Sequence, residues 1–206
     1  LKGANLLTPV AGTVRMLENS PSFGPEILGG LKAKSGLTQD DANLQTFLNV
    51  LQATIDTVDP INHAELLDNV LFSQINDDSV VINNGRNTLV EDTSFETPGG
   101  SIPLSLNGSL APLSGSEPLA ALAEANALNS SNTAADPVEL PAFVKFWNKG
   151  VHSTPVLPAD DDETAVFTQM VVQTLSIIAT DGDVASVMST DAVDPAEDSL
   201  RSVVDQ

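Results

Sequence analysis

The 206 residues are 41% hydrophobic, which suits one compact domain with a sizeable core, or part of a larger domain. Eight Lys and Arg stand against 28 Asp and Glu, and the formal net charge of -20 argues against nucleic acid or an anionic membrane as a partner. The absence of cysteine excludes disulfides, thiolate metal sites and a cysteine nucleophile, and no apolar run approaches the roughly 18 residues of a membrane-spanning helix.

The first part of the chain predicts a strand and then helices. Residues 1–14 (LKGANLLTPVAGTV) read as a short apolar strand that leads into a loop with Gly and Pro. Residues 20–37 hold a short helix at most, because Gly29 and Gly30 lower the helix propensity. Residues 38–60 predict an amphipathic helix that Thr38 or Asp40 can cap. Its apolar residues recur at three- and four-residue steps: Leu44, Phe47, Leu48, Leu51 and Ile55.

The middle of the chain predicts a buried strand and a long irregular insertion. Residues 62–69 give a short helix capped by Asn62, and residues 70–75 (VLFSQI) give a buried strand that ends in the acidic turn NDDS. Residues 83–141 are poor in regular pattern. They have room for one hairpin and for a helix over residues 117–128.

The last part predicts a strand, a long helix and a polar tail. The strand covers residues 142–147, and the helix covers residues 160–180 with Asp161 or Asp162 as its cap. Five apolar residues lie along one face of this helix: Phe167, Met170, Val171, Leu175 and Ile178. A short final strand over residues 183–189 precedes the tail.

Together these elements predict the C-terminal portion of a single α/β domain over residues 1–190, with a mostly parallel sheet flanked by helices, followed by a polar tail over residues 191–206. The opening LKGANLLTP reads like the middle of a fold, and the first residue is Leu1. We therefore expect the chain to be a processed or truncated piece of a longer protein.

Acidic and basic side chains follow two successive strands. Asp77 and Asp78 come directly after residues 70–75, and His152 follows residues 142–147. An acid, a histidine and a terminal helix, in that order, match an α/β-hydrolase downstream of its serine. In such a site the histidine takes the serine proton, and the carboxylate holds the imidazole in the correct tautomer. Loops at the carboxyl ends of parallel strands are the expected place for this chemistry.

The nucleophile is missing from this sequence. No Gly-x-Ser-x-Gly motif occurs in the 206 residues, and in this fold the serine precedes both the acid and the histidine. We expect it to lie on an N-terminal part outside this chain, which agrees with the abrupt start.

Five segments resemble, in order, parts of a family of large extracellular bacterial lipases, the virulence-factor lipases, whose surface-exposed members are lysophospholipase-like α/β-hydrolases. The resemblance covers most of residues 1 to about 180. The segments are GANLLTPVAGTVRMLENSPSFGPEIL, DPINHAELL, NDDSVVIN, APLSGSEPL and KGVHSTPV.

This resemblance implies a Ser-His-Asp hydrolase of acyl esters, such as lysophospholipids or triacylglycerols, at the cell exterior or outer-membrane surface. It makes Asp78 the triad acid, with Asp77 as the fallback, and His152 the triad base. No cofactor or metal is implied. The partner would be the N-terminal fragment that carries the serine. Two residues depart from the family pattern: His63 replaces an aromatic residue, and Pro155 follows His152 closely.

Other interpretations stay open. His152 can be an ordinary loop histidine, and NDDS an ordinary turn. The chain would then be a non-catalytic, acidic extracellular structural or binding module. A metal-dependent hydrolase is weaker, because the two histidines, His63 and His152, lack the paired spacing of zinc sites.

Three further features have two interpretations each. Residues 159–164 (ADDDET) can bind calcium, although consecutive acids suit helix capping better. Trp147 can pack in the core or against an acyl site. Residues 98–116 can form a lid or an acyl-binding rim.

Overall fold

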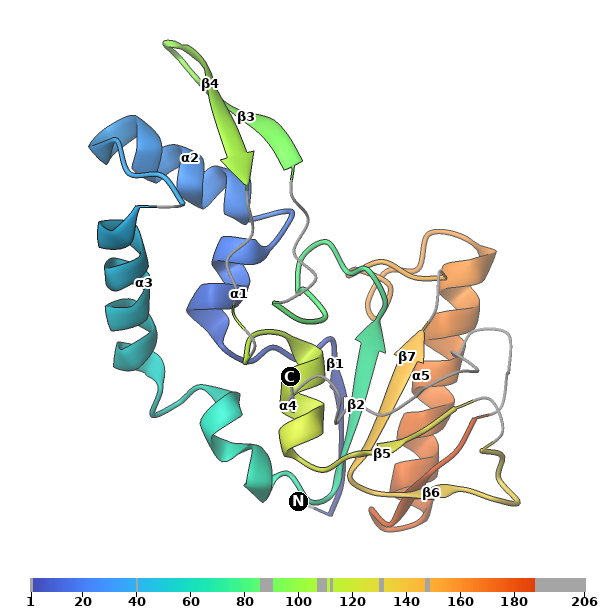
Figure 1. Ribbon diagram of the computed structural model, residues 1–206. Coiled ribbons are helices and arrows are strands. Elements are labelled where there is room, and N and C mark those ends of the chain that lie inside the picture. Colours follow the sequence, from blue (N-terminus) through green and yellow to red (C-terminus); the bar gives the residue numbers. More distant parts are fainter. Residues whose placement is uncertain are drawn as a thin grey trace.

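A four-stranded parallel sheet lies at the centre of the computed structural model (Figure 1). The structure describes residues 2–39, 41–85, 91–106, 111, 113–129, 132–146 and 149–187. The sheet has the order β1-β2-β7-β5, and every neighbouring pair is parallel. Its strands are β1 (Ala4–Leu7), β2 (Val70–Ile75), β7 (Ala142–Phe146) and β5 (Asn126–Ala127). The chain is therefore an α/β protein, as the sequence predicted.

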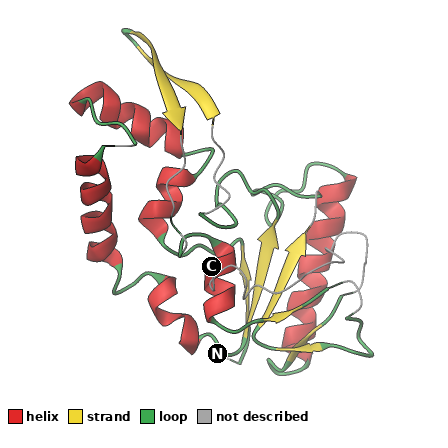
Figure 2. Ribbon diagram, viewed as in Figure 1, coloured by secondary structure: helices red, strands yellow, loops and turns green. Residues whose placement is uncertain are grey.

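Helices cover both faces of this sheet (Figure 2). Helix α5 (Asp161–Ala179) lies on one face, where Val166, Met170 and Ile177 pack against Leu71 and Phe146. Helix α4 (Ser116–Leu122) and the 3-10 helix η1 (Pro60–Leu66) lie on the other face. There the fully buried rings of Phe72 and Phe143 meet Leu119 of α4. All six residues of β2 are buried, as expected for a central parallel strand.

Three helices between β1 and β2 form a separate layer beside the sheet. They are α1 (Thr13–Asn19), α2 (Gly24–Ser35) and α3 (Ala42–Ile55). Val14, Leu28, Leu44 and Leu48 form a small core among these helices. On its other side α1 contacts the loop after β2, where Met16 packs with Val81 and Ile82.

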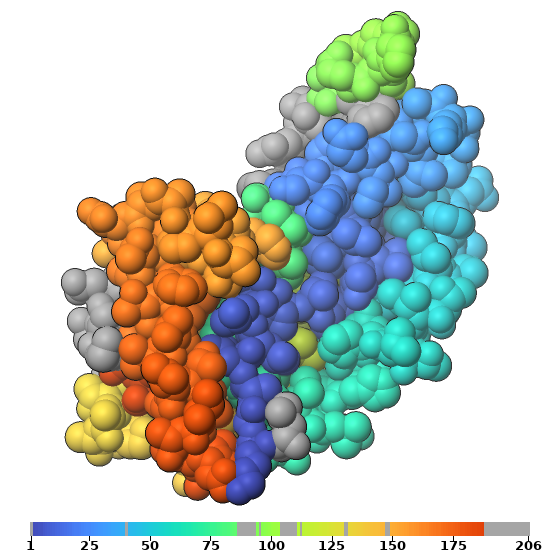
Figure 3. Space-filling model, turned by 180° about the vertical axis from the view of Figure 1, so that it is seen from behind, coloured from blue at the N-terminus to red at the C-terminus, as the bar shows by residue number. Residues whose placement is uncertain are grey.

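A hairpin extends beyond α2 and consists of β3 (Glu91–Thr97) and β4 (Gly100–Leu106) (Figure 3). It confirms the single hairpin that the sequence left room for. A hydrogen bond joins the hairpin to α2, because Lys32 Nζ donates to the Pro103 carbonyl at 2.6 Å. A second antiparallel pair joins β6 (Val138–Glu139) to β8 (Val184–Ala185), a shorter final strand than the predicted one. Residues 188–206, which include the predicted tail, lie outside the described residues.

Helix α2 is longer than the short helix that the sequence predicted. It runs for 12 residues, with Pro25 in its first turn and Gly36 as its left-handed C-cap. Packing outweighs the propensity cost of its glycines. At Gly24 an added Cβ would lie 2.6 Å from the Glu18 carbonyl oxygen, so only glycine lets α1 and α2 approach this closely.

The caps of three helices differ from the predicted residues. Asp41 caps α3 by accepting from the Asn43 N–H, in place of Thr38 or Asp40. Asp59 caps η1 in place of Asn62, and Asp160 caps α5 in place of Asp161 or Asp162. A cap must directly precede the first helical turn. In runs of adjacent acids the sequence does not show which residue that is.

Asp59 joins two helix starts. Its carboxylate is buried and accepts from the N–H groups of Gly12 (2.9 Å), Thr13 (2.8 Å) and Ile61 (3.2 Å). The Gln52 amide donates to it at 3.0 Å. Burial alone would raise the pKa of Asp59, but these donors outweigh burial and hold the pKa below its usual value.

The apolar stripe that the sequence shows on α5 is mostly not the side of the helix that packs on the sheet. Of the predicted stripe only Met170 is fully buried, whereas Val171, Leu175 and Ile178 are 40%, 57% and 69% exposed. The sheet-facing side instead carries Gln169 and Gln173 between its apolar residues. Helix α5 therefore has apolar side chains on two sides, one toward the sheet and one toward solvent. No described helix is both long and apolar enough to cross a membrane.

Candidate active site

The loops that follow β2 and β7 meet at one edge of the sheet, because the two strands are parallel neighbours. Ile75 and Phe146, the last residues of these strands, are paired in register. The Asn76 N–H extends the pairing by donating to the Phe146 carbonyl at 3.1 Å. Residues 76–84 and 149–160 therefore begin side by side, at the carboxyl ends where open α/β sheets assemble their sites.

The structure brings Asp78 and His152 into direct contact at this edge. Asp78 Oδ2 lies 2.8 Å from Nδ1 of His152, although 74 positions separate the two residues. The Asp78 side chain is only 2% exposed, whereas the His152 side chain is 37% exposed. A buried carboxylate thus holds an imidazole whose other side is open to solvent.

The turn after β2 fixes the orientation of Asp78. Its second oxygen, Oδ1, accepts from the N–H groups of Val80 (2.8 Å) and Val81 (3.2 Å). Asn83 supports the turn by accepting from the Asp77 N–H at 2.8 Å and donating to the Ile75 carbonyl at 2.8 Å. Both Asp78 oxygens are therefore used, one by the backbone and one by the histidine.

Asp77, the alternative acid, points elsewhere. It has a positive φ of 53°, and its exposed side chain accepts from the Asn76 amide at 3.0 Å. Asp78, not Asp77, is the acid that pairs with His152. The left-handed backbone at Asp77 turns the next residue into the protein, and the sequence NDDS does not reveal which aspartate this is.

A buried threonine and glutamate shape the histidine loop. The fully buried Thr154 hydroxyl accepts from the Val151 N–H at 2.9 Å and donates to Glu163 Oε2 at 2.9 Å. The same carboxylate oxygen accepts from the Ala159 N–H at 3.3 Å. The loop on both sides of His152 is therefore tied to the first turn of α5. Thr154 and Glu163 were not predicted from the sequence, since nothing in the spacing of a threonine and a glutamate signals this contact.

The remaining ring nitrogen of His152 is available for chemistry. If Nδ1 of the neutral imidazole donates to Asp78, then Nε2 carries a lone pair. No described residue forms a hydrogen bond with this Nε2, and the ring is more than one-third exposed. The pair can therefore accept a proton at Nε2 while the carboxylate stabilises the resulting imidazolium.

A buried ion pair fixes the end of the loop after β2, residues 76–84, which carries Asp78. Lys145 Nζ lies 2.8 Å from Oε1 of Glu117, which is 5% exposed at the start of α4. The Glu117 N–H donates to the Asn83 carbonyl at 2.9 Å, and its Oε2 accepts from the Asn84 amide. The start of α4 thus holds the loop that carries Asp78.

The other candidate residues have structural surroundings. His63 lies in η1, and its Nε2 is 3.0 Å from the Thr57 carbonyl oxygen. In the ADDDET segment, Asp160 caps α5 through the Glu163 N–H at 2.8 Å. The described residues contain no group of three or more His, Asp or Glu placed to hold a metal ion. Trp147 lies outside the described residues.

Fold and site define a class: an α/β protein with a buried-acid–histidine pair at the carboxyl ends of two neighbouring parallel strands. No protein-family model, curated protein sequence or solved structure matches this chain.

Proposed function

We propose that the chain supplies the acid and the base of a serine ester hydrolase. The observation that carries the proposal is the 2.8 Å contact between His152 Nδ1 and the buried, doubly anchored carboxylate of Asp78. The residues match the Asp and His roles of a Ser-His-Asp triad. The ordered resemblance to virulence-factor lipases points to acyl esters as the substrate class and to the cell exterior or outer-membrane surface as the location.

The chemistry would proceed in two halves. A serine hydroxyl attacks the acyl carbon while its proton moves to Nε2 of His152, and Asp78 stabilises the imidazolium. The imidazolium then returns the proton to the leaving alcohol, which departs. Water repeats the sequence on the acyl-serine, and the products are a carboxylic acid and the free serine.

The serine is proposed to come from a further segment of the same protein, because the 206 residues contain no Gly-x-Ser-x-Gly motif. The open edge of the sheet supports this. β1 ends the strand order, and nothing among the described residues pairs with its outer side. Next to it, Leu7 (40% exposed), Val171 and Leu175 form an apolar surface. Parallel sheets are normally covered on both faces, so an additional strand and helix would suit this edge.

The test is to isolate the chain from its native source under non-denaturing conditions, label it with a fluorophosphonate and measure intact masses. We expect a labelled serine on a longer form of this chain or on a tightly bound second polypeptide. In that material His152→Ala should abolish ester hydrolysis, and His63→Ala should leave it unchanged. Native material that hydrolyses no ester and takes up no fluorophosphonate would contradict the proposal.

The second candidate is a non-catalytic acidic module that binds another protein. Its support is the solvent-exposed apolar side chains in so acidic a chain, including Val156 (82% exposed) and Leu157 (71% exposed) beside the histidine loop. Stable co-purification with a partner that lacks a fluorophosphonate-reactive serine would favour this function. Single substitutions of Asp78 and His152 would then leave the association unchanged.

A further inference from the structure

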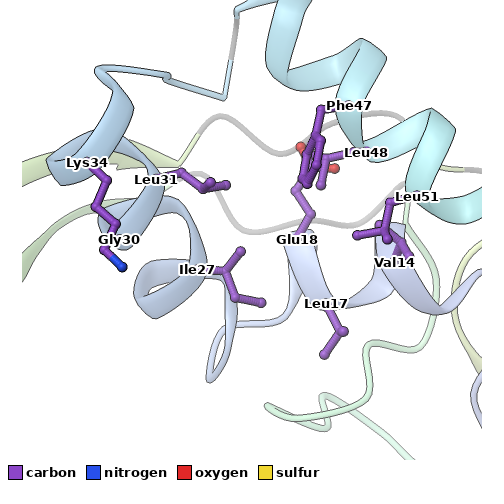
Figure 4. Close-up of a pocket in the computed structure, with 10 residues that line it drawn as sticks. All are labelled: Val14, Leu17, Glu18, Ile27, Gly30, Leu31, Lys34, Phe47, Leu48 and Leu51. Atoms are coloured by element: carbon purple, nitrogen blue, oxygen red, sulfur yellow. The ribbon is translucent and has the colours of Figure 1, made fainter.

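An apolar pocket of about 360 Å³ lies among α1, α2 and α3, away from the Asp78–His152 pair (Figure 4). Its volume falls in the range of roughly 300–1,000 Å³ that is typical of small-molecule sites. Ile27 and Leu31 of α2 face Phe47, Leu48 and Leu51 of α3 across the pocket. Val14, Leu17 and Glu18 of α1 complete the wall.

Among the described residues, none offers a ligand a free polar group inside the pocket. Glu18 is the acidic residue in the wall, and its side chain is fully buried. The amides of Gln39 (3.3 Å) and Gln45 (3.0 Å) donate to one carboxylate oxygen. Arg15 pairs with the other oxygen at 3.1 Å. An apolar group that enters the pocket therefore displaces no hydrogen bond of this carboxylate.

The mouth of the pocket combines exposed apolar side chains with a cation. Phe47 and Leu51 are 50% and 40% exposed, so the pocket opens toward solvent between α2 and α3. Lys34 lies at the rim on the exposed side of α2. It has no hydrogen-bond or ion-pair partner among the described residues, unlike Lys32, which donates to Pro103.

We propose that this pocket binds the alkyl chain of a single-chain amphiphile with an anionic head, such as a fatty-acid carboxylate, with the head on Lys34. The alkyl chain suits the apolar wall, and the head suits the Lys34 ammonium, which has no partner among the described residues. The inference depends only on the pocket and Lys34 and is independent of ester hydrolysis.

Gly30 allows the pocket to be filled without damage to the fold. It lies in α2 and lines the pocket, and an added Cβ would meet nothing within 4 Å. Gly30→Leu should therefore place a side chain in the cavity. Gly30→Ala is the matched control, because it makes the same backbone change and adds only a methyl group. Both replace a mid-helix glycine, so both should melt no lower than the parent chain.

The experiment is calorimetric titration of the chain with sodium n-alkyl carboxylates of six to twelve carbons, below their micelle concentrations. Affinity should rise about fourfold for each added methylene and level off once the cavity is full. Gly30→Leu should weaken binding of the longest chain at least tenfold, and Gly30→Ala much less. Leu175→Ser, on the separate apolar surface of α5, should leave the affinity unchanged.

The head group is tested with matched n-alkyl alcohols and amines. The parent chain and Lys34→Arg should prefer the carboxylate over the amine, and Lys34→Met should lose that preference while binding the alcohol normally. Three results would overturn the inference. They are no saturable binding of the twelve-carbon carboxylate, binding that Gly30→Leu does not weaken, and equal affinity of the parent chain for carboxylate and amine.

Discussion

Replacing Asp78 by asparagine separates the charge of the acid from its shape. The amide oxygen can still accept from the N–H groups of Val80 and Val81, as Oδ1 does now. The amide NH2 then takes the position of Oδ2, 2.8 Å from Nδ1 of His152. Two donors cannot face each other, so Nδ1 must become an acceptor and the imidazole proton must move to Nε2.

The size of the effect follows from the hydrogen bonds. Two backbone bonds change from charge-assisted to neutral, at about 1 kcal/mol each, so Asp78→Asn should lower the free energy of unfolding by about 2 kcal/mol. Asp78→Ala leaves two N–H groups without an acceptor and should cost about 2–5 kcal/mol. If the esterase proposal holds, Asp78→Asn should lower kcat on the order of 10⁴-fold, because its histidine has the wrong tautomer to act as base.

Long-range ¹H–¹⁵N correlation spectra at alkaline pH read the tautomer of each histidine directly. The parent chain should show His152 protonated at Nδ1, and Asp78→Asn should show it protonated at Nε2. His63 is an internal control: its Nε2 must carry the proton to donate to the Thr57 carbonyl, in both proteins. If His152 of the parent chain carries its proton on Nε2, or if its tautomer is the same in Asp78→Asn, the reasoning about this pair is refuted.

Three other substitutions test the supports of the fold and the site. Asp59 has a lowered pKa, so its ionised form contributes stability that is complete above its unfolded pKa of about 4 and is lost as the pH falls through the lower, folded value. Urea unfolding should therefore show Asp59→Asn less stable than the parent at pH 7, with a difference that shrinks below about pH 4; a constant difference would contradict this. Thr154→Val removes the hydroxyl from the buried Glu163 carboxylate and should lower the free energy of unfolding by about 2–3 kcal/mol in urea titrations. Thr154→Ser should recover most of this loss, and an equal loss in both would assign the effect to packing. Gly115→Ala should lower the melting temperature sharply in thermal scans, because Gly115 has φ 115° and an added Cβ would lie 2.5 Å from the Asn83 carbonyl oxygen. An unchanged melting temperature would show that the start of α4 does not pack closely against the loop that carries Asp78.

Elements with a strong hydrophobic pattern could be predicted from the sequence. Which side of a helix packs against the sheet could not. The run VLFSQI is mostly apolar and β-favouring, and all six of its residues are buried in β2. Helix α5 was also predicted, but its pattern did not show which face packs on the sheet. Its apolar residues occupy two sides, and the sheet takes the side that includes Gln169 and Gln173. Periodicity shows that a helix has apolar residues, but packing decides which of two apolar sides meets the sheet.

The candidate site divides in the same way. The order of the predicted strands was enough to identify Asp78 and His152 as candidate site residues, because the loops after neighbouring parallel strands meet at one edge of the sheet. The choice of Asp78 over Asp77 depended on a resemblance, and in the structure it follows from a left-handed residue at position 77. Thr154 and Glu163 could not be found at all, because their contact depends on how the histidine loop folds back onto α5.

The exposed side of α5 constrains what completes the site. Its surface continues onto Leu7 of β1, so a single partner could cover both the helix and the sheet edge. The direction of a strand added beside β1 decides at which edge of the sheet its following loop lies. The loop after β1 begins at Thr8, whose N–H donates to the Ser73 carbonyl two residues before the end of β2, at the same sheet edge as the Asp78 loop. A strand added parallel to β1 would therefore deliver its own following loop, and any serine on it, to the open Nε2 of His152. An antiparallel strand would cover the same apolar surface but carry its following loop to the opposite edge. The apolar surface thus accounts for a partner of either kind, and the proposed hydrolase, whose serine would follow a strand, requires a parallel one.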